Sequence, residues 1–93
     1  MKLPATATLD ETAALAQALP AEIAAGSGTL TVDASALATF DSSAIALLLQ
    51  ARRLAQAAGR GFVVHGAPPK LAELATLYGV VELLSLEGAG TAA

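Results

Sequence analysis

A chain of 93 residues has room for one domain, and because 55% of its residues are hydrophobic but only 3% aromatic, its core must be aliphatic and rich in alanine. The net charge of −3 argues against nucleic acid as a partner, which would need a basic surface, and against binding to a membrane by charge. With no cysteine and a single histidine, His65, the chain offers no disulfide, no thiolate metal site and no multi-histidine site, so we expect neither a metal nor another cofactor.

The first third of the chain predicts a strand followed by a helix. Residues 3–9 alternate between apolar and polar side chains, which favours a strand at or near the edge of a sheet. Asp10 is a candidate N-cap for a helix that carries an apolar stripe and ends near Gly26. Pro20 should kink or divide this helix, because proline lacks an amide donor and crowds the preceding turn.

The middle third predicts a second strand and a second helix. Residues 29–33 alternate as a strand, and we interpret Asp33 at its end as a turn-forming carboxylate. After a linker over 34–40, a helix is predicted from about Ser42 to Ala58, because apolar residues recur at helical spacing before Gly59. Its apolar stripe is predicted to contain Ile45, Leu48, Ala51 and Ala55, and the opposite side to carry a basic face of Arg52, Arg53 and Arg60.

The last third predicts a third strand and a third helix. Residues 62–65 form an apolar run closed by Gly66, and Pro68-Pro69 suits the first turn of a helix that ends at Gly79. The helix carries a stripe of Leu71, Leu74, Ala75 and Tyr78. We assign this stripe to the core first, and the alternative for Tyr78 is that its hydroxyl reaches the surface. Residues 88–93 have no side chains whose burial could offset the entropic cost of ordering the chain. We therefore expect one domain over 1–87 and a flexible tail over 88–93.

This alternation of strands and helices predicts an α/β fold. Strands joined through helices usually pair in parallel by right-handed crossovers. Periodicity alone leaves open whether the helices cover one face of the sheet or both. The chain is short enough for one layer of helices over one small sheet.

One polar motif, Asp41-Ser42-Ser43, stands directly before the most apolar run of the chain. This change is typical of a helix N-terminus at a surface, where Asp and Ser oxygens accept hydrogen bonds from free amides. The plain interpretation is a helix cap. A phosphate on Ser43 would also suit a helix N-terminus, although Asp41 would repel it. We find no phosphate-binding glycine loop, no nucleophile with a base and no catalytic role for His65, so we do not expect an enzyme.

The chain resembles a STAS domain over nearly its full length. Four blocks carry the resemblance, at residues 30–37, 40–48, 59–66 and 71–80, with Asp41-Ser42-Ser43 inside the second. The resemblance implies a single small domain with a mixed, mostly parallel sheet and helices mainly on one face. It also implies binding to partner proteins in place of catalysis.

Two branches of this family differ in which serine matters. In the cytoplasmic STAS subunit of the Mla phospholipid-transport ABC complex, which serves outer-membrane lipid asymmetry, the important hydroxyl follows the aspartate and falls on Ser42. Such a subunit would bind the cytoplasmic ATPase and stabilise or activate it. In anti-sigma factor antagonists a serine is phosphorylated by a partner anti-sigma factor kinase, and that position falls on Ser43.

Three features favour similarity to the Mla branch: the ending over 71–80, the apolar run over 46–49 and the short start over 3–10. Against it, Ser42 replaces the usual threonine. Both branches expect glycine where this chain has Ala44, whose methyl would narrow the approach of a partner's backbone. The resemblance thus implies partner binding through Asp41, Ser42, Ser43 and Ala44.

We expect a cytoplasmic chain. Arg52-Arg53 cut the best apolar run short of the ~20 residues that a membrane span needs, and residues 1–9 do not read as a signal peptide. Any attachment to the inner membrane would be peripheral and made through the partner.

Overall fold

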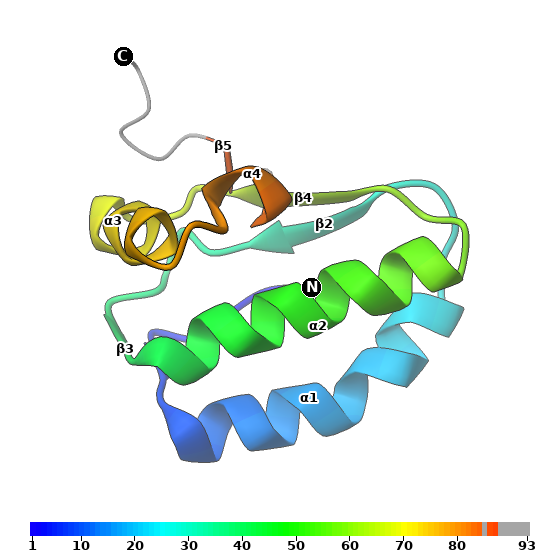
Figure 1. Ribbon diagram of the computed structural model, residues 1–93. Coiled ribbons are helices and arrows are strands. Elements are labelled where there is room, and N and C mark those ends of the chain that lie inside the picture. The colour runs from blue at the N-terminus through cyan, green and yellow to red at the C-terminus, as the bar shows by residue number, and fades with distance from the viewer. Residues whose placement is uncertain (85, 88–93) are drawn as a thin grey trace.

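The computed structural model describes residues 1–84 and 86–87. In chain order these residues form β1 (Thr6–Ala7), α1 (Leu9–Ala24), β2 (Leu30–Asp33), β3 (Thr39–Phe40), α2 (Ser42–Ala57), β4 (Phe62–His65), α3 (Pro69–Leu77), α4 (Val81–Leu84) and β5 (Leu86–Glu87) (Figure 1). The predicted order of strand, helix, strand, helix, strand and helix is present, and β3, α4 and β5 are additional to it. The predicted tail over 88–93 lies outside the described residues.

The main sheet has the strand order β2-β4-β5, and both pairings are parallel. Leu30 pairs with Phe62 and Asp33 with His65, so the two longer strands are in register over their full length. An isolated parallel bridge between Lys2 and Asp33 lies on the other side of β2. The prediction of an α/β fold with a mostly parallel sheet is confirmed.

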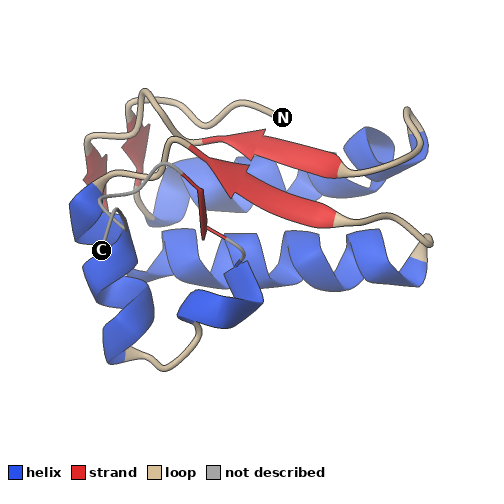
Figure 2. Cartoon of the chain, turned by 90° about the horizontal axis from the view of Figure 1, so that it is seen from above, coloured by secondary structure: helices blue, strands red, loops and turns tan. Residues whose placement is uncertain are grey.

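The helices lie mainly on one face of this sheet. Seen from above, β2 and β4 stand in front of α1 and α2, and no helix of the described residues crosses the near face (Figure 2). Burial alternates accordingly: Val32 and Val64 are completely buried, whereas Thr31 and His65 are exposed. The family-based expectation of a one-sided helix layer is therefore confirmed.

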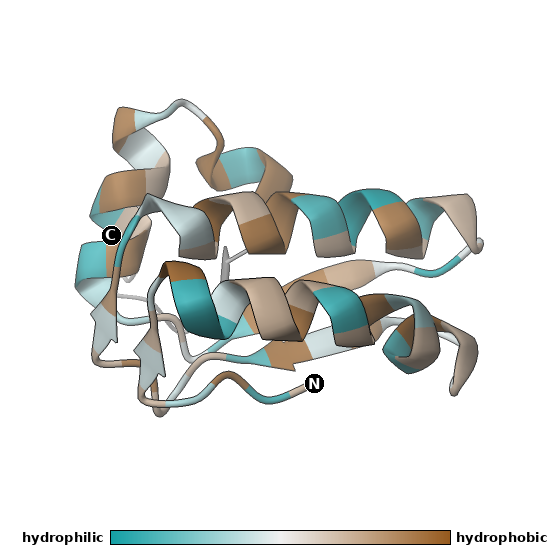
Figure 3. Ribbon diagram, turned by 90° about the horizontal axis from the view of Figure 1, so that it is seen from below, coloured by the Kyte–Doolittle hydropathy of each residue, from teal (hydrophilic) through white to brown (hydrophobic). Residues whose placement is uncertain are grey.

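A second, two-stranded parallel sheet includes β3, which lies within the segment predicted as a linker. β1 pairs with β3 in the register Thr6 to Thr39 and Ala7 to Phe40. The strand predicted over 3–9 is correspondingly shorter, because Leu9 already begins α1. Each strand is followed two residues later by a helix, so α1 and α2 begin side by side and run in the same direction (Figure 3).

α2 joins the two sheets into one core. Its predicted stripe is confirmed, because Ile45, Leu48, Ala51 and Ala55 are all at most 3% exposed. Burying a leucine such as Leu48 contributes about 1.5–3 kcal/mol to folding. The anchored body of α2 therefore fixes the position of its first turn.

The C-terminus of α2 is closed by Gly59, as predicted. Gly59 has a φ of 75°, its amide donates to the Gln56 carbonyl at 3.0 Å, and the amide of Arg60 donates to the Ala55 carbonyl at 2.8 Å. These two bonds form a Schellman motif, which needs a left-handed residue that glycine adopts without strain. Gly79 ends α3 by the same pair of bonds.

α1 differs from its prediction at its N-cap, and at Pro20 it bends without being divided. Its N-cap is Thr8 and not Asp10, because the Glu11 carboxylate reaches back to accept bonds from the Thr8 amide at 3.0 Å and the Thr8 hydroxyl at 2.6 Å. Pro20 does not divide the helix, which continues to Ala24. The ribbon of α1 does change direction in its second half (Figure 1).

α3 begins at Pro69 as predicted, with Pro68 as its N-cap. Leu71 and Ala75 are buried, but Tyr78 is 51% exposed. The core placement of Tyr78 is therefore wrong and its alternative, a tyrosine that reaches the surface, is confirmed, because the residue follows the last turn of the helix as its C-cap.

Candidate functional site

The predicted partner-binding motif lies at an exposed end of the molecule. The first turn of α2 stands beside the start of α1 on one side and near α3 on the other (Figure 1). The residues before it belong to β3, whose pairing with β1 holds the two helix starts together. Local sequence therefore forms the turn, and a long-range strand pair places it.

Asp41 caps α2. Its backbone is extended, and its Oδ1 atom accepts a hydrogen bond from the Ser43 amide at 2.9 Å and another from the Ser43 hydroxyl. The Ser43 hydroxyl bond lowers the pKa of Asp41 most, and the backbone amides of Ser43 and Leu9 lower it further. A charged Asp41 carboxylate therefore lies where the positive ends of α1 and α2 meet.

The two serines of the motif have different environments. Ser43 is half-buried and its hydroxyl is engaged by Asp41. Ser42 is exposed, and its hydroxyl makes no hydrogen bond within the part of the chain that the structure describes. The Ser42 hydroxyl is thus available to another molecule, whereas that of Ser43 must first leave Asp41.

Ala44 is completely buried. Its methyl belongs to the core beneath the turn and does not face outward in this conformation. A partner approaching the turn therefore meets Asp41, Ser42 and Ser43, while Ala44 supports them from below.

A wide groove, which we call the β3–α3 groove, lies beside the turn. It has a volume of about 500 Å³ and is lined by Ala38, Thr39, Phe40, Lys70, Glu73, Leu74 and Leu77. Leu77 is 77% exposed. The groove is mainly apolar, with one cation and one anion from α3 on its wall.

A smaller groove, the α1–α2 groove, lies on the other side of the turn. It has a volume of about 180 Å³ and is lined by Leu9, Thr12, Ala13, Ala16, Ser43, Ala46, Leu47 and Gln50. Leu9 is 68% exposed. The polar turn therefore stands between two grooves, each with an exposed leucine on its wall.

Sequence reasoning missed both leucines. Leu9 was assigned to the end of a strand. In the structure it is the first residue of α1, and its side chain is exposed there. Leu77 could have been found, because it falls six positions after the buried Leu71 and so projects from a different side of α3.

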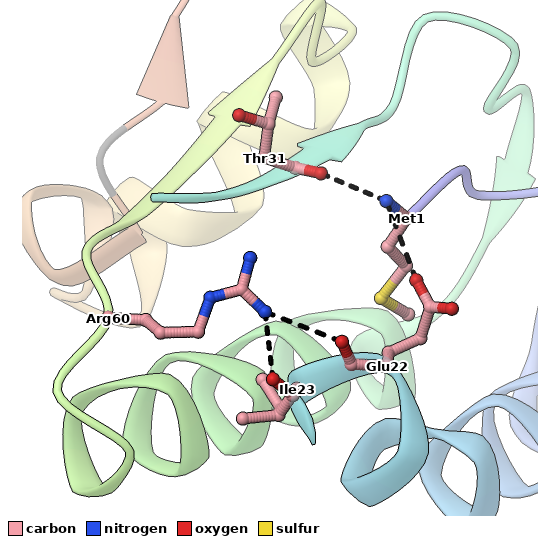
Figure 4. A network of polar contacts seen from close by, with 5 residues as sticks. All are labelled: Met1, Glu22, Ile23, Thr31 and Arg60. Atoms are coloured by element: carbon pink, nitrogen blue, oxygen red, sulfur yellow. Dashed lines mark hydrogen bonds and ion pairs between the residues drawn. The ribbon is translucent and has the colours of Figure 1, made fainter. Parts of the chain in front are cut away.

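At the opposite end of the helix pair, Arg60 overturns the predicted basic face. Its Nε donates to the Gly28 carbonyl at 2.9 Å, and its Nη1 donates to the carbonyls of Ile23 at 3.0 Å and Glu22 at 3.4 Å. Figure 4 shows the guanidinium pointing to the end of α1. Arg60 lies beyond the end of α2 and caps another helix, so it does not share a face with Arg52 and Arg53.

Asp33 has the predicted turn role. Its Oδ1 accepts a hydrogen bond from the Ser35 amide at 2.9 Å, and the Ser35 hydroxyl is the largest cause that lowers the pKa of Asp33. His65, its register partner in β4, is exposed.

Within the described residues, no group of three or more His, Cys, Asp or Glu side chains is placed to hold a metal ion.

None of the helices formed by residues 1–84 is long and apolar enough to cross a membrane.

Comparison with protein families matches most of the chain to one of them. The model of the family described as Mlab, STAS domain matches residues 1–85. No curated protein matches the chain.

Proposed function

The chain belongs to the STAS domain family of the MlaB type, and from this premise we propose that it is a non-catalytic subunit of a phospholipid-transporting ABC complex. In this role it binds the cytoplasmic ATPase of the complex and stabilises or activates it. Its place is then the cytoplasmic side of the inner membrane, reached through the ATPase and without insertion of the chain itself.

One observation carries this proposal: the polar turn at the start of α2 stands between two apolar grooves with exposed leucines. Protein interfaces commonly combine a few apolar anchors with polar groups that fix orientation. Leu77 and Leu9 provide the anchors, with 77% and 68% of their surfaces exposed. The turn between them provides the polar groups.

Contacts within the chain already hold the turn in one conformation. Asp41 is tied to Ser43, and Ala44 is packed in the core beneath them. Binding then costs little ordering of the turn, which favours affinity. Ser42 is left as the hydroxyl that makes a new hydrogen bond to the partner.

The absence of enzymatic activity is part of the proposal. General acid–base chemistry needs titratable groups held in complementary states. Within the motif, the ionisable group that interacts electrostatically with Glu11 is Asp41, which is also a carboxylate. Hydrogen bonds lower the pKa of both carboxylates. Two charged carboxylates at helix starts are suited to capping.

The proposal is tested by binding to the ATPase of the candidate transporter. Purified chain and ATPase are titrated by calorimetry, and ATP hydrolysis is followed with and without the chain. Leu77→Ala and Ser42→Ala should each weaken binding about tenfold, the loss of one anchor or one hydrogen bond at an interface. Leu83→Ala is the matched control, because Leu83 is 42% exposed on α4 and lines neither groove.

Failure of the chain to bind the ATPase, together with unchanged ATP hydrolysis and unchanged ATPase stability, would contradict the proposal. Equal weakening by Leu83→Ala would place the interface elsewhere on the domain.

A second candidate is an anti-sigma factor antagonist phosphorylated at Ser43. The position of the Ser43 hydroxyl in the first turn of α2 favours it, because a phosphate there meets free amides. The carboxylates of Asp41 and Glu11 oppose it. After incubation with the anti-sigma factor kinase, intact mass decides: one phosphate that is lost in Ser43→Ala and kept in Ser42→Ala supports this candidate over the ATPase subunit.

A further inference from the structure

The α1–α2 groove is part of a longer uncharged seam between the two helices. On α2 the groove is lined by Ser43, Ala46 and Gln50, which recur at helical spacing. On α1 no residue from 12 to 21 carries a charge. Figure 3 views the molecule from this side, with the two helices next to each other. Soluble domains usually carry charges along an exposed helix face, so an uncharged seam of this length is a candidate contact surface.

Opposite charges stand at the two ends of the seam. Asp10 and Asp41 lie at its start, and Arg53 follows Gln50 by three residues and so continues the same stripe of α2. Arg53 follows Asp41 by twelve positions, which corresponds to roughly 18 Å along a helix. Asp10 and Arg53 are exposed, and neither takes part in an ion pair with another residue that the structure describes.

This charge pattern is complementary to itself. A second copy turned by a two-fold axis, with its α2 antiparallel to the first, brings its Arg53 opposite the Asp10 and Asp41 of the first copy, and the same contact forms twice. The axis passes near Ala46 and Ala13, whose small side chains permit a close approach of the helices. We propose that the α1–α2 seam is a self-association surface whose occupant is a second copy of this chain.

The exposed leucine of the seam fits this arrangement. Leu9 and Asp10 begin α1 at the level of the first turn of α2, so the Arg53 that reaches Asp10 passes Leu9. An arginine side chain covers apolar surface with its methylene stem while its guanidinium meets a carboxylate. Each Arg53 thus covers the Leu9 of the other copy. Self-association also covers Ser43, so it competes with any partner bound at the start of α2.

Sedimentation equilibrium over a range of concentrations tests the proposal. The mass should rise from 9.2 kDa towards twice that value as concentration increases. Arg53→Glu and Asp10→Lys should each weaken self-association about tenfold or more, because each places like charges together at both symmetric contacts. An equimolar mixture of the two variants should restore it, since one contact is then native and the other has its charges exchanged.

Arg52→Glu is the matched control, with the same change of charge one residue away and outside the seam stripe; it should leave the mass curve unchanged. A wild-type chain that stays at 9.2 kDa up to millimolar concentration overturns the proposal. A mixture that fails to restore association overturns it as well. If the chain is monomeric and Arg53→Glu weakens ATPase binding, the seam belongs to that partner and the self-association proposal is wrong.

Discussion

At each end of the α1–α2 pair, a charged side chain lies against the ends of the two helices, but one end is closed by its contacts and the other stays open. At the C-terminal ends, the Arg60 guanidinium meets the carbonyls of Ile23 and Gly28. At the N-terminal ends, the Asp41 carboxylate is held by Ser43 and lies close to the Leu9 amide. Each charge has the sign that the helix dipoles favour.

The two ends differ in how much polar and apolar surface they leave open to another molecule. Arg60 reaches across from the loop after α2 and closes its end of the pair. The Asp41 end keeps two open grooves and a Ser42 hydroxyl that makes no hydrogen bond to residues 1–84 or 86–87. We conclude that the closed end serves stability and that the open end is the better candidate for recognition.

The largest expected effect on stability is at the closed end. Arg60→Ala removes the charge-assisted hydrogen bonds to the end of α1, and should lower the free energy of unfolding by about 1–3 kcal/mol in urea titrations. Arg60→Lys should lose less, because it keeps the charge but not the fork of donors. ATPase binding by the folded variant should be unchanged; a large binding loss would contradict the division between the two ends.

A smaller effect is expected where α2 ends. Gly59→Ala meets no atom within 4 Å, so its cost comes from the φ of 75° alone and should be about 1 kcal/mol. Gly59→Asn should cost less, because asparagine tolerates this conformation. Thermal unfolding followed by circular dichroism measures both. Equal stability of Gly59→Ala and the wild type would mean that the Schellman motif is dispensable.

The smallest effect is a pH dependence at the open end. Hydrogen bonds lower the pKa of Asp41 below its ordinary value of 3.8, so the folded state favours its charged form. Its contribution to stability is complete above about pH 5 and is lost as the pH falls through the folded pKa. Urea titrations between pH 6 and pH 2 should show this loss, and Ser43→Ala should reduce it by removing the hydroxyl donor. If the free energy of unfolding falls equally with pH in the wild type and in Ser43→Ala, this role of Ser43 is contradicted.

The sequence predicted the features that depend on neighbouring residues and missed those that depend on residues far apart in the chain. α2 was predicted almost to the residue, because Asp41 and Gly59 mark its ends and its buried stripe repeats at helical spacing. β3 was missed, because a two-residue strand is recognisable only from its pairing with β1. Arg60 was wrongly assigned to a basic face of α2, since the carbonyls that it binds lie 32 to 38 residues away in the chain.

The candidate site divides in the same way. The family resemblance named Asp41, Ser42, Ser43 and Ala44 as partner-binding residues, and that assignment stays a prediction. The different states of the two serines and the burial of Ala44 came only from the structure. The flanking grooves were not predictable, because α1, β3 and α3 contribute walls that only the tertiary arrangement brings to the turn.

The pairing of β1 with β3 also has a consequence for the order of folding. Thr6 and Thr39 are far apart in the chain, and closing such a loop is entropically costly until other contacts support it. We expect the open end to assemble late, after α2 has packed on the main sheet. A partner that requires both grooves would then select chains that have completed folding, so binding itself would serve as quality control before assembly.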